Sequence, residues 1–244
     1  LRTSEEGERI PLTVADFDRE KGVLTLIFQV VGASTELLAQ MKEGDTILDL
    51  VGPLGQKSHI ASGLGTVVCI GGGIGVAPVY PITRGMKEAG NRVISIMGAK
   101  SRDILIMEEE MRAASDETLV TTDDGSYGIK GFVTTALKEL LARGERIDLV
   151  YAIGPVVMMK SVADVTRPLG IKTIVSLNPV MVDGTGMCGG CRVQVGGETK
   201  FACVDGPEFD GAIVDFAGLQ ARQGMYREME AKAREHVCRI GLGG

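Results

Sequence analysis

Three closely spaced cysteines are the residues of this sequence best suited to hold an inorganic centre. Cys188, Cys191 and Cys203 form the pattern C-x2-C-x11-C, and glycines surround the first two. Plant-type 2Fe–2S sites carry a further ligand five residues before such a C-x2-C pair, and that position here is Asp183. Because a carboxylate can ligate iron, we expect Asp183, Cys188, Cys191 and Cys203 to bind a 2Fe–2S cluster.

Two alternatives remain open for this cysteine group. Zinc accepts three cysteines and a fourth ligand, although closed zinc sites usually combine two short-spaced ligand pairs. The group could also consist of reduced cysteines with a structural role. The histidines, His59 and His236, lie in other segments, and Cys238 lies far beyond Cys203 in a predicted helix. None of these three is the preferred fourth ligand.

The number and placement of the cysteines also bear on the cell compartment. Five cysteines are an odd number, and the sequence shows no secretory signal. This pattern is typical of thiol or metal chemistry in a reducing compartment, not of a disulfide framework. We therefore expect a cytoplasmic protein, in which Cys69 is a small apolar residue of a buried strand.

A glycine-rich turn is the second feature with chemical potential. The apolar run at 67–70 leads into residues 71–78, which read GGGIGVAP and precede a predicted helix. Glycine lets backbone amides approach a pyrophosphate, and a helix N-terminus attracts negative charge. The spacing is not G-x-G-x-x-G, and tight packing between a strand and a helix also uses glycine, so this turn alone is weak evidence.

Further small or polar segments follow other predicted strands. They cover residues 98–103, 121–128 and 152–156. Ligands bind at the carboxyl ends of the strands in open parallel sheets. Together with the glycine-rich turn, these segments predict a nucleotide cleft.

The order of predicted elements divides the chain into four parts. Residues 1–62 read as a β module with strands at 23–31 and 46–51 and a short helix at 35–42, capped by Ser34 or Thr35. Residues 63–178 alternate between strands and helices, which predicts a doubly wound parallel α/β domain. Residues 179–211 form a compact metal-type segment, and 212–244 a helix, at about 219–238, and tail. In the α/β part we expect strands at 66–70, 92–97, 118–122, 149–153 and 173–176, and helices at 79–88, 105–114, 133–142 and 157–167.

Composition excludes several other classes. The chain has 244 residues, 34 glycines, 44% hydrophobic residues and a net charge of −6. The glycine share is about twice the usual one, but there is no collagen period and enough apolar residue for a core. A basic face with stacking aromatics is absent, so we expect no nucleic-acid partner. No uninterrupted apolar run of about 18 residues exists, so we expect no membrane association.

A β module, a GGGxGxAP nucleotide module and a C-terminal cluster segment, in this order, resemble the ferredoxin–NADP reductase superfamily. Within it, the chain is similar to electron-transfer subunits related to that of dihydroorotate dehydrogenase. It is most similar to the small subunit of NADH-dependent reduced ferredoxin:NADP+ oxidoreductase, whose pattern also has Asp at position 183 and a segment like 201–211. The resemblance implies an α+β multidomain protein with an antiparallel β-barrel FAD domain at 1–62, followed by an NAD(P) domain and the 2Fe–2S segment.

The resemblance also implies where FAD binds. Its flavin motif falls on residues 9–13 but lacks the usual tyrosine, since position 12 is Leu. The implied FAD-binding residues are Arg9, Pro11, Leu12, Thr13, Gly32, Ser34, Thr35, Gly52, Pro53 and Leu54. A barrel of this family is longer than the 70 residues that precede Gly71, so we expect one or two N-terminal strands to be absent from this sequence.

The implied dinucleotide contacts lie at the strand ends. They are Gly72, Gly73, Gly75, Ala77, Pro78, Asp123, Gly154 and Pro155. The family favours NAD(H). Lys100 and Arg102 follow the second parallel strand, where cations can bind a 2′-phosphate, so NADP(H) remains an alternative.

Taken together, the resemblance implies an oxidoreductase subunit that carries FAD and a 2Fe–2S cluster. It would exchange hydride with NAD(H) and electrons with a larger iron–sulfur flavoprotein in a heterodimer, in electron bifurcation between NAD(H), NADP(H) and ferredoxin. The alternatives are the electron-transfer subunit of a dihydroorotate dehydrogenase, or of a hydrogenase or sulfur reductase. An alternative of another class is a non-catalytic redox-binding module.

Overall fold

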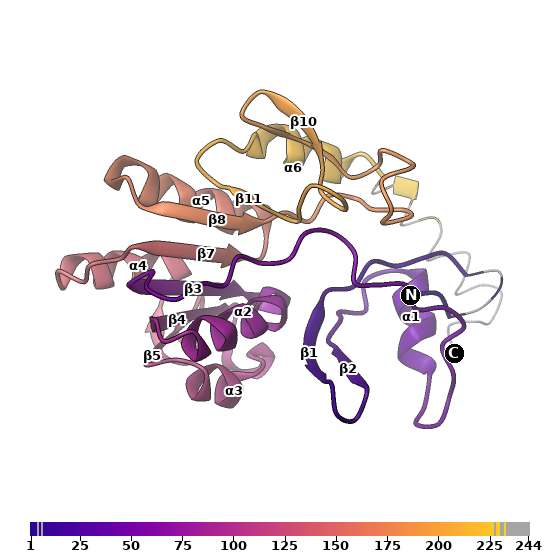
Figure 1. The fold of residues 1–244 in the computed structure, drawn as a ribbon, viewed down its shortest axis with the longest axis horizontal. Helices are drawn as coiled ribbons and strands as arrows, with labels where there is room; N and C mark the ends of the chain where they lie inside the picture. The colour runs from indigo at the N-terminus through magenta and orange to yellow at the C-terminus, as the bar shows by residue number, and fades with distance from the viewer. Residues whose placement is uncertain (4, 6, 227, 230–231, 233–244) are drawn as a thin grey trace.

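The computed structural model describes residues 1–3, 5, 7–226, 228–229 and 232, and a seven-stranded sheet forms its centre (Figure 1). The strand order is β11-β8-β7-β3-β4-β5-β6, and only β11 runs antiparallel to its neighbour. The strands are β3 (Thr66–Gly72), β4 (Arg92–Ala99), β5 (Glu117–Thr122), β6 (Ile129–Lys130), β7 (Leu149–Ile153), β8 (Lys172–Ser176) and β11 (Glu208–Asp210). The five predicted parallel strands are confirmed.

The central strands form because their residues are apolar on both faces. Every residue of β3 and β7 is buried, as expected of a parallel sheet covered by helices on both sides. Helices α2 (Val76–Glu88) and α3 (Glu108–Ala113) pack on one face, and α4 (Val133–Ala142) and α5 (Val156–Thr166) on the other. The doubly wound arrangement is therefore confirmed.

Glycines end three of these helical segments. Gly90, Gly144 and Gly170 have φ angles of 83°, 78° and 67°, the left-handed region in which glycine avoids a steric penalty. Helix α3 is shorter than the predicted range of 105–114. It begins only at Glu108 because Met107 before it has a φ of 56°, which no helix continues through.

The N-terminal module consists of the hairpin β1 (Val14–Asp18) and β2 (Val23–Leu26), helix α1 (Ala33–Gln40) and irregular segments. The strand predicted at 23–31 ends at Leu26, where pairing with β1 stops. The prediction of a strand at 46–51 is wrong. Within the described residues this segment has a single bridge, between Asp49 and Arg2, because no neighbouring strand runs beside it.

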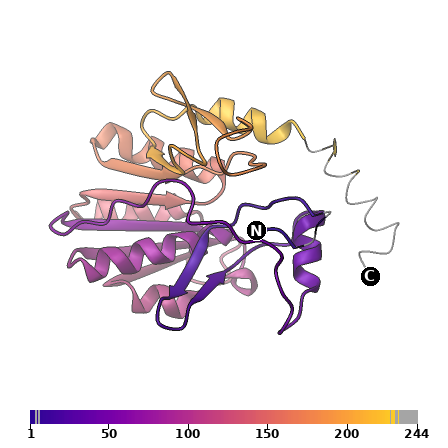
Figure 2. The same ribbon diagram turned by 45° about the vertical axis from the view of Figure 1, so that its right-hand side comes forward.

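One cluster of side chains joins this hairpin to the α/β domain. Arg84 of α2 donates to Asp16 of β1 at 2.6 Å. Its guanidinium also lies 5.6 Å from the ring centre of Phe17 and 5.3 Å from that of Tyr80. Figure 2 shows the hairpin beside α2 from a second direction, with α1 further out.

The C-terminal segment packs on the face covered by α5. It contains the hairpin β9 (Arg192–Val195) and β10 (Glu198–Phe201) and helix α6 (Phe216–Gly224). The predicted helix at 219–238 begins earlier, at Phe216, because the Asp215 carboxylate accepts a hydrogen bond from the backbone amide of Gly218. Cys238 lies outside the described residues. No helix in the described part of the chain is long and apolar enough to cross a membrane.

Candidate functional site

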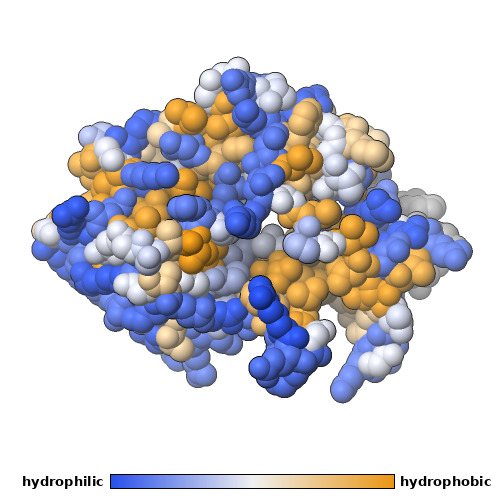
Figure 3. All heavy atoms as spheres, viewed as in Figure 1, coloured by the Kyte–Doolittle hydropathy of each residue, from blue (hydrophilic) through white to orange (hydrophobic). Residues whose placement is uncertain are grey.

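The carboxyl ends of the parallel strands open into one large cavity of about 2180 Å³. Residues from the ends of β3, β4, β5 and β7 line it, as do residues of the N-terminal module and of the cluster segment. Figure 3 shows the molecule hollowed between the α/β domain and the N-terminal module, whose apolar residues gather beside the hollow. The sheet thus brings the predicted strand-end segments together at one site.

Close packing explains why glycine occupies most positions of the glycine-rich turn. A Cβ atom on Gly75 would lie 2.2 Å from the carbonyl oxygen of Ile153, and one on Gly72 would lie 2.3 Å from the Met158 sulfur. These glycines let the turn after β3 contact the turn after β7. Gly73 differs, because it has a φ of 55° and a Cβ atom on it would meet nothing within 4 Å. Its backbone faces open space, as a ligand cradle requires.

Most of the predicted dinucleotide residues line the cavity, namely Gly72, Gly73, Gly75, Pro78, Asp123, Gly154 and Pro155. Ala77 does not. It is 1% exposed within α2, where its methyl group packs in the core of the domain. The remaining set offers backbone amides at a helix start and one carboxylate, Asp123, which are the groups that hold a pyrophosphate and a ribose.

The two cations after β4 have different surroundings. Lys100 lines the cavity, whereas Arg102 does not. The Arg102 guanidinium lies 5.0 Å from the ring centre of Tyr127, and the Tyr127 hydroxyl donates to Glu108 at 2.9 Å. Burial favours a higher pKa for Glu108, but hydrogen bonds from Arg112 and Tyr127 and the charge of Arg102 together lower it. Arg102 therefore has partners of its own, and the case for a 2′-phosphate site rests on Lys100.

The predicted flavin residues divide into two groups. Arg9, Pro11, Leu12, Thr13, Gly52, Pro53 and Leu54 line the cavity. Gly32, Ser34 and Thr35, at the start of α1, lie outside its lining. The Thr35 hydroxyl accepts hydrogen bonds from the amides of Val31 and Gly32 and donates to the Gly32 carbonyl. The Thr35 side chain thus holds the turn that leads into α1.

Many lining residues were not predicted from the sequence, among them Phe28, Ser58, Phe132 and Glu208. Phe28 supplies an aromatic ring to the same cavity as the motif that lacks its tyrosine. Phe132 is 65% exposed at the start of α4, so its ring is available to a ligand. An aromatic residue directly before a predicted helix was a usable signal for Phe132. Nothing local marked Ser58 or Glu208, which meet across 150 positions of sequence.

The four predicted cluster ligands come together as two pairs. The Cys188 amide donates to the Asp183 carboxylate at 3.0 Å, and the Cys191 and Cys203 sulfurs lie 3.1 Å apart. Within the described residues, no three His, Cys, Asp or Glu side chains converge on one point closely enough to hold a metal ion. Two pairs suit a binuclear cluster, in which each iron takes two protein ligands. A single zinc ion needs all four ligands at one point.

Electrostatics of the pairs are compatible with iron binding. Hydrogen bonds from the amides of Thr185 and Cys188 lower the pKa of Asp183, so this carboxylate is ionised. Burial and the neighbouring Cys191 raise the pKa of Cys203 to about 11. A bound metal deprotonates such a thiol outright. By contrast, burial raises the pKa of Cys69 to about 12, and this residue lies in β3 as the predicted small apolar residue.

Glycines also shape the loop around these ligands. Gly184, Gly186 and Gly189 have φ angles of 76°, 87° and 66°, which other residues rarely adopt. A Cβ atom on Gly186 would lie 2.5 Å from a methyl group of Val204. Because these positions carry no side chains, the backbone of the loop can wrap closely around a compact inorganic group.

The fold and the site define a class: proteins with a ferredoxin–NADP reductase-like fold, composed of FAD- and NAD-binding domains and a C-terminal iron–sulfur domain. Residues 69–164 match the oxidoreductase NAD-binding domain family, and residues 178–215 match the iron–sulfur cluster binding domain of dihydroorotate dehydrogenase B. The chain belongs to the family of dihydroorotate dehydrogenase B electron-transfer subunits and their homologues. The family and fold support FAD, a 2Fe–2S cluster and NAD(H) as cofactors.

Individual relatives support this assignment. A dihydroorotate dehydrogenase B electron-transfer subunit homologue of Thermotoga maritima is 52% identical over 239 residues, covering 98% of this chain and 84% of the relative. The electron-transfer subunit of Bacillus caldolyticus is 38% identical over 208 residues, covering 82% and 77%. A solved structure of NADH-dependent reduced ferredoxin–NADP oxidoreductase, studied for flavin-based electron bifurcation, is 51% identical with a TM-score of 0.90, covering 97% and 85%.

Proposed function

We propose that this oxidoreductase subunit exchanges hydride with NAD(H) and passes electrons to a larger iron–sulfur flavoprotein subunit, in flavin-based bifurcation between NAD(H), NADP(H) and ferredoxin. The observation that carries the proposal is the single cavity lined by the flavin segment, the glycine-rich turn and the cluster loop. When bound, FAD accepts hydride and releases electrons singly, and the cluster carries one electron at a time.

The chain's own residues would position these groups. Residues 9 and 11–13 and the turn at 52–54 would hold the flavin from the N-terminal module. Gly72, Gly73, Gly75, Pro78, Gly154 and Pro155 would hold the dinucleotide, with Asp123 on a ribose. Asp183 and Cys188 would bind one iron, and Cys191 and Cys203 the other. The chain directly after the 52–54 turn lies on the cluster segment, since the Gln56 amide donates to the Gly206 carbonyl at 2.7 Å.

We further propose NAD(H) as the preferred nucleotide. Asp123 lines the cavity and would repel a 2′-phosphate, while Arg102 is engaged by Tyr127. Lys100, which lines the cavity, favours NADP(H) instead. Direct comparison of NADH and NADPH dissociation constants tests this preference, and tighter binding of NADPH would contradict it.

The dihydroorotate dehydrogenase role is the second candidate, because relatives 34–38% identical bear that name. The experiment that separates the two is purification of the native complex, followed by identification of its large subunit and by flavin and iron analysis. The favoured function predicts a partner with its own FAD and additional iron–sulfur clusters. A partner with FMN and no further iron would support the second candidate, and a chain that purifies alone without flavin would contradict both.

A further inference from the structure

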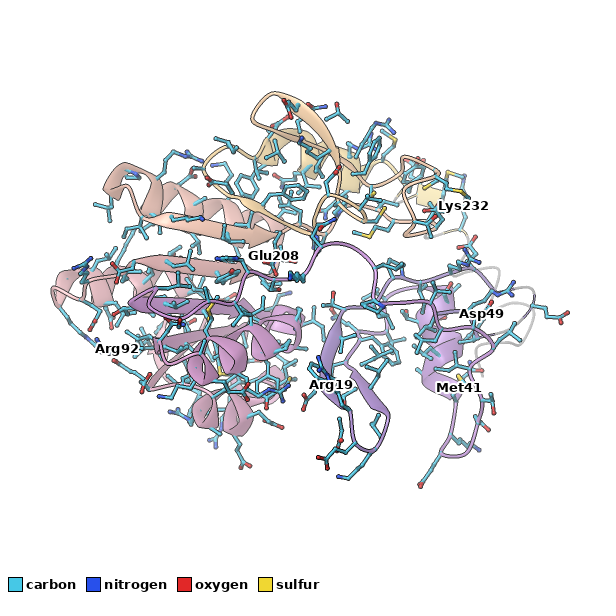
Figure 4. All side chains as sticks on the ribbon, viewed as in Figure 1. Arg19, Met41, Asp49, Arg92, Glu208 and Lys232 are labelled. Atoms are coloured by element: carbon cyan, nitrogen blue, oxygen red, sulfur yellow. The ribbon has the colours of Figure 1, made fainter. Side chains whose placement is uncertain are left out.

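A half-buried carboxyl group lines the cavity at the carboxyl edge of the sheet, and the function proposed above assigns it no role. Glu208 is the first residue of β11, opposite Ser176 at the end of β8. Its carboxylate accepts a hydrogen bond from the Ser58 hydroxyl. Figure 4 shows Glu208 near the middle of the molecule, where the sheet, the cluster segment and the chain leading from the N-terminal module meet.

The pairing of Ser58 with Glu208 is built into the fold. Gln56 donates its amide to the Gly206 carbonyl at 2.7 Å and its side-chain nitrogen to the Val204 carbonyl at 2.8 Å. Gly55 allows this approach, because a Cβ atom there would lie 2.7 Å from the Gly206 oxygen. Residues 55–58 are thereby fastened along residues 204–208, and Ser58 is held against Glu208.

Few polar groups face this carboxyl group. Ser58 comes from the 55–58 segment, with Lys57 and His59 beside it in sequence, and Tyr151 comes from β7. The Tyr151 hydroxyl donates to the His59 carbonyl at 3.2 Å. No basic side chain is paired with Glu208 in the part of the chain that the structure describes. Burial therefore raises the pKa of Glu208, and the hydrogen bond from Ser58 only partly opposes this. The Glu208 charge in turn contributes to a raised pKa of Tyr151, after burial.

The proposed function requires a proton to enter and leave this cavity. NADH donates a hydride and becomes NAD+, whereas a 2Fe–2S cluster accepts electrons without protons. Each NADH oxidised therefore yields NAD+, two electrons and one proton, and that proton must pass to a protein group or to solvent. A carboxyl group whose pKa is raised above its ordinary value is suited to such exchange.

We propose that Glu208, paired with Ser58, takes up this proton when electrons leave the cavity and supplies it in the reverse direction. The inference rests on the proposed function. Glu208 alternates between carboxylate and carboxylic acid, and the Ser58 hydroxyl, which can both donate and accept, keeps a hydrogen bond in either state. The proton is passed on to solvent through the open cavity.

The test uses the native complex carrying wild type, Glu208→Gln, Ser58→Ala or Glu88→Gln. Glutamine preserves the shape and the hydrogen bond from Ser58 but cannot exchange a proton. Glu88→Gln is the matched control, because it removes a carboxyl group that lines the same cavity but has a 71% exposed side chain. Bleaching of the flavin absorbance by NADH is measured first in each complex. Wild type that is not bleached would refute the proposed function and this inference with it.

Infrared difference spectra between oxidised and NADH-reduced complex then test Glu208 itself. We expect a carboxylic acid carbonyl band in wild type that shifts in D₂O, persists in Glu88→Gln and disappears in Glu208→Gln. In Ser58→Ala the band should remain with a changed frequency, which also tests the pair if Glu208→Gln fails to fold. We also expect electron delivery in Glu208→Gln to slow by about 10²-fold and to lose a pH-dependent step. A band that persists in Glu208→Gln, or that is absent from wild type, would overturn the inference while leaving the proposed function intact.

Discussion

Backbone amides donate hydrogen bonds to Asp183 and to two of the three cysteine sulfurs, and these bonds help to hold the predicted ligands in place. Asp183 accepts from Thr185 at 2.8 Å and from Cys188 at 3.0 Å. The Cys188 sulfur accepts from Gly190 at 3.3 Å, and the Cys191 sulfur from Cys203 at 3.4 Å. Hydrogen bonds of this kind to cluster ligands are one of the levers that set a reduction potential.

At the residue scale, replacing Asp183 by Cys tests the unusual ligand directly. We expect Asp183→Cys to retain a 2Fe–2S cluster, because a thiolate can take the same position, and to shift its midpoint potential by on the order of 100 mV. Redox titration followed by electron paramagnetic resonance measures the shift. Asp205→Asn is the matched control, since the Asp205 carboxylate accepts from the Phe201 amide and is not one of the predicted ligands. An unchanged potential and spectrum in Asp183→Cys would show that Asp183 is not a ligand.

At the element scale, the turn between β3 and α2 depends on glycine for contact with the turn after β7. We expect Gly75→Ala to lower the free energy of unfolding by about 1–3 kcal/mol, because its methyl group would collide with the Ile153 carbonyl. The dissociation constant for NADH should rise as the cavity edge shifts. Urea denaturation and NADH titration measure the two effects.

Gly90→Ala is the control for that substitution. Gly90 has a positive φ, but no atom lies within 4 Å of its missing Cβ and it does not line the cavity. We expect a cost of about 1 kcal/mol from the left-handed backbone alone, with NADH binding unchanged. Equal effects of the two substitutions on NADH binding would contradict the role given to Gly75.

The contact between the hairpin β1–β2 and α2 is a second element-scale feature. We expect Arg84→Met to cost about 1 kcal/mol, because it removes the ion pair with Asp16 and the contacts with two rings. Hydrogen exchange at residues 14–26 should accelerate. Arg92→Met removes ion pairs at the start of β4, away from the hairpin. It should leave hydrogen exchange in the hairpin unchanged. Unaltered hairpin exchange in Arg84→Met would contradict this account.

Local sequence predicted the five longer parallel strands of the central sheet. The parallel strands β3, β4, β5, β7 and β8 lie between turns and are rich in apolar and β-branched residues, and glycines at positions 90, 144 and 170 mark helix ends. The prediction at 46–51 failed because an alternating apolar pattern cannot say whether a pairing strand exists. Glu208 could not be predicted either, since its hydrogen-bond partner Ser58 lies 150 positions away in the sequence. The predicted residues on the strand ends line one cavity because the parallel topology gathers these ends at one edge of the sheet.

At the scale of the whole molecule, three segments far apart in the sequence share one cavity. The N-terminal module contributes Thr13, the glycine-rich turn contributes Gly73, and the cluster loop contributes Asp183. A hydride acceptor, a nucleotide and a one-electron carrier can therefore lie close together in one subunit. This arrangement carries the central claim that the chain converts hydride transfer into single-electron transfer.

Anaerobic titration of the native complex with NADH tests that claim most directly, with visible absorbance and electron paramagnetic resonance recorded on the same sample. We predict that about one equivalent of NADH bleaches the flavin of this subunit and that a reduced 2Fe–2S signal appears with it, whereas NADPH acts on this subunit far more weakly. A flavin that NADH leaves oxidised, or a bleached flavin with no electron on the 2Fe–2S cluster, would contradict it.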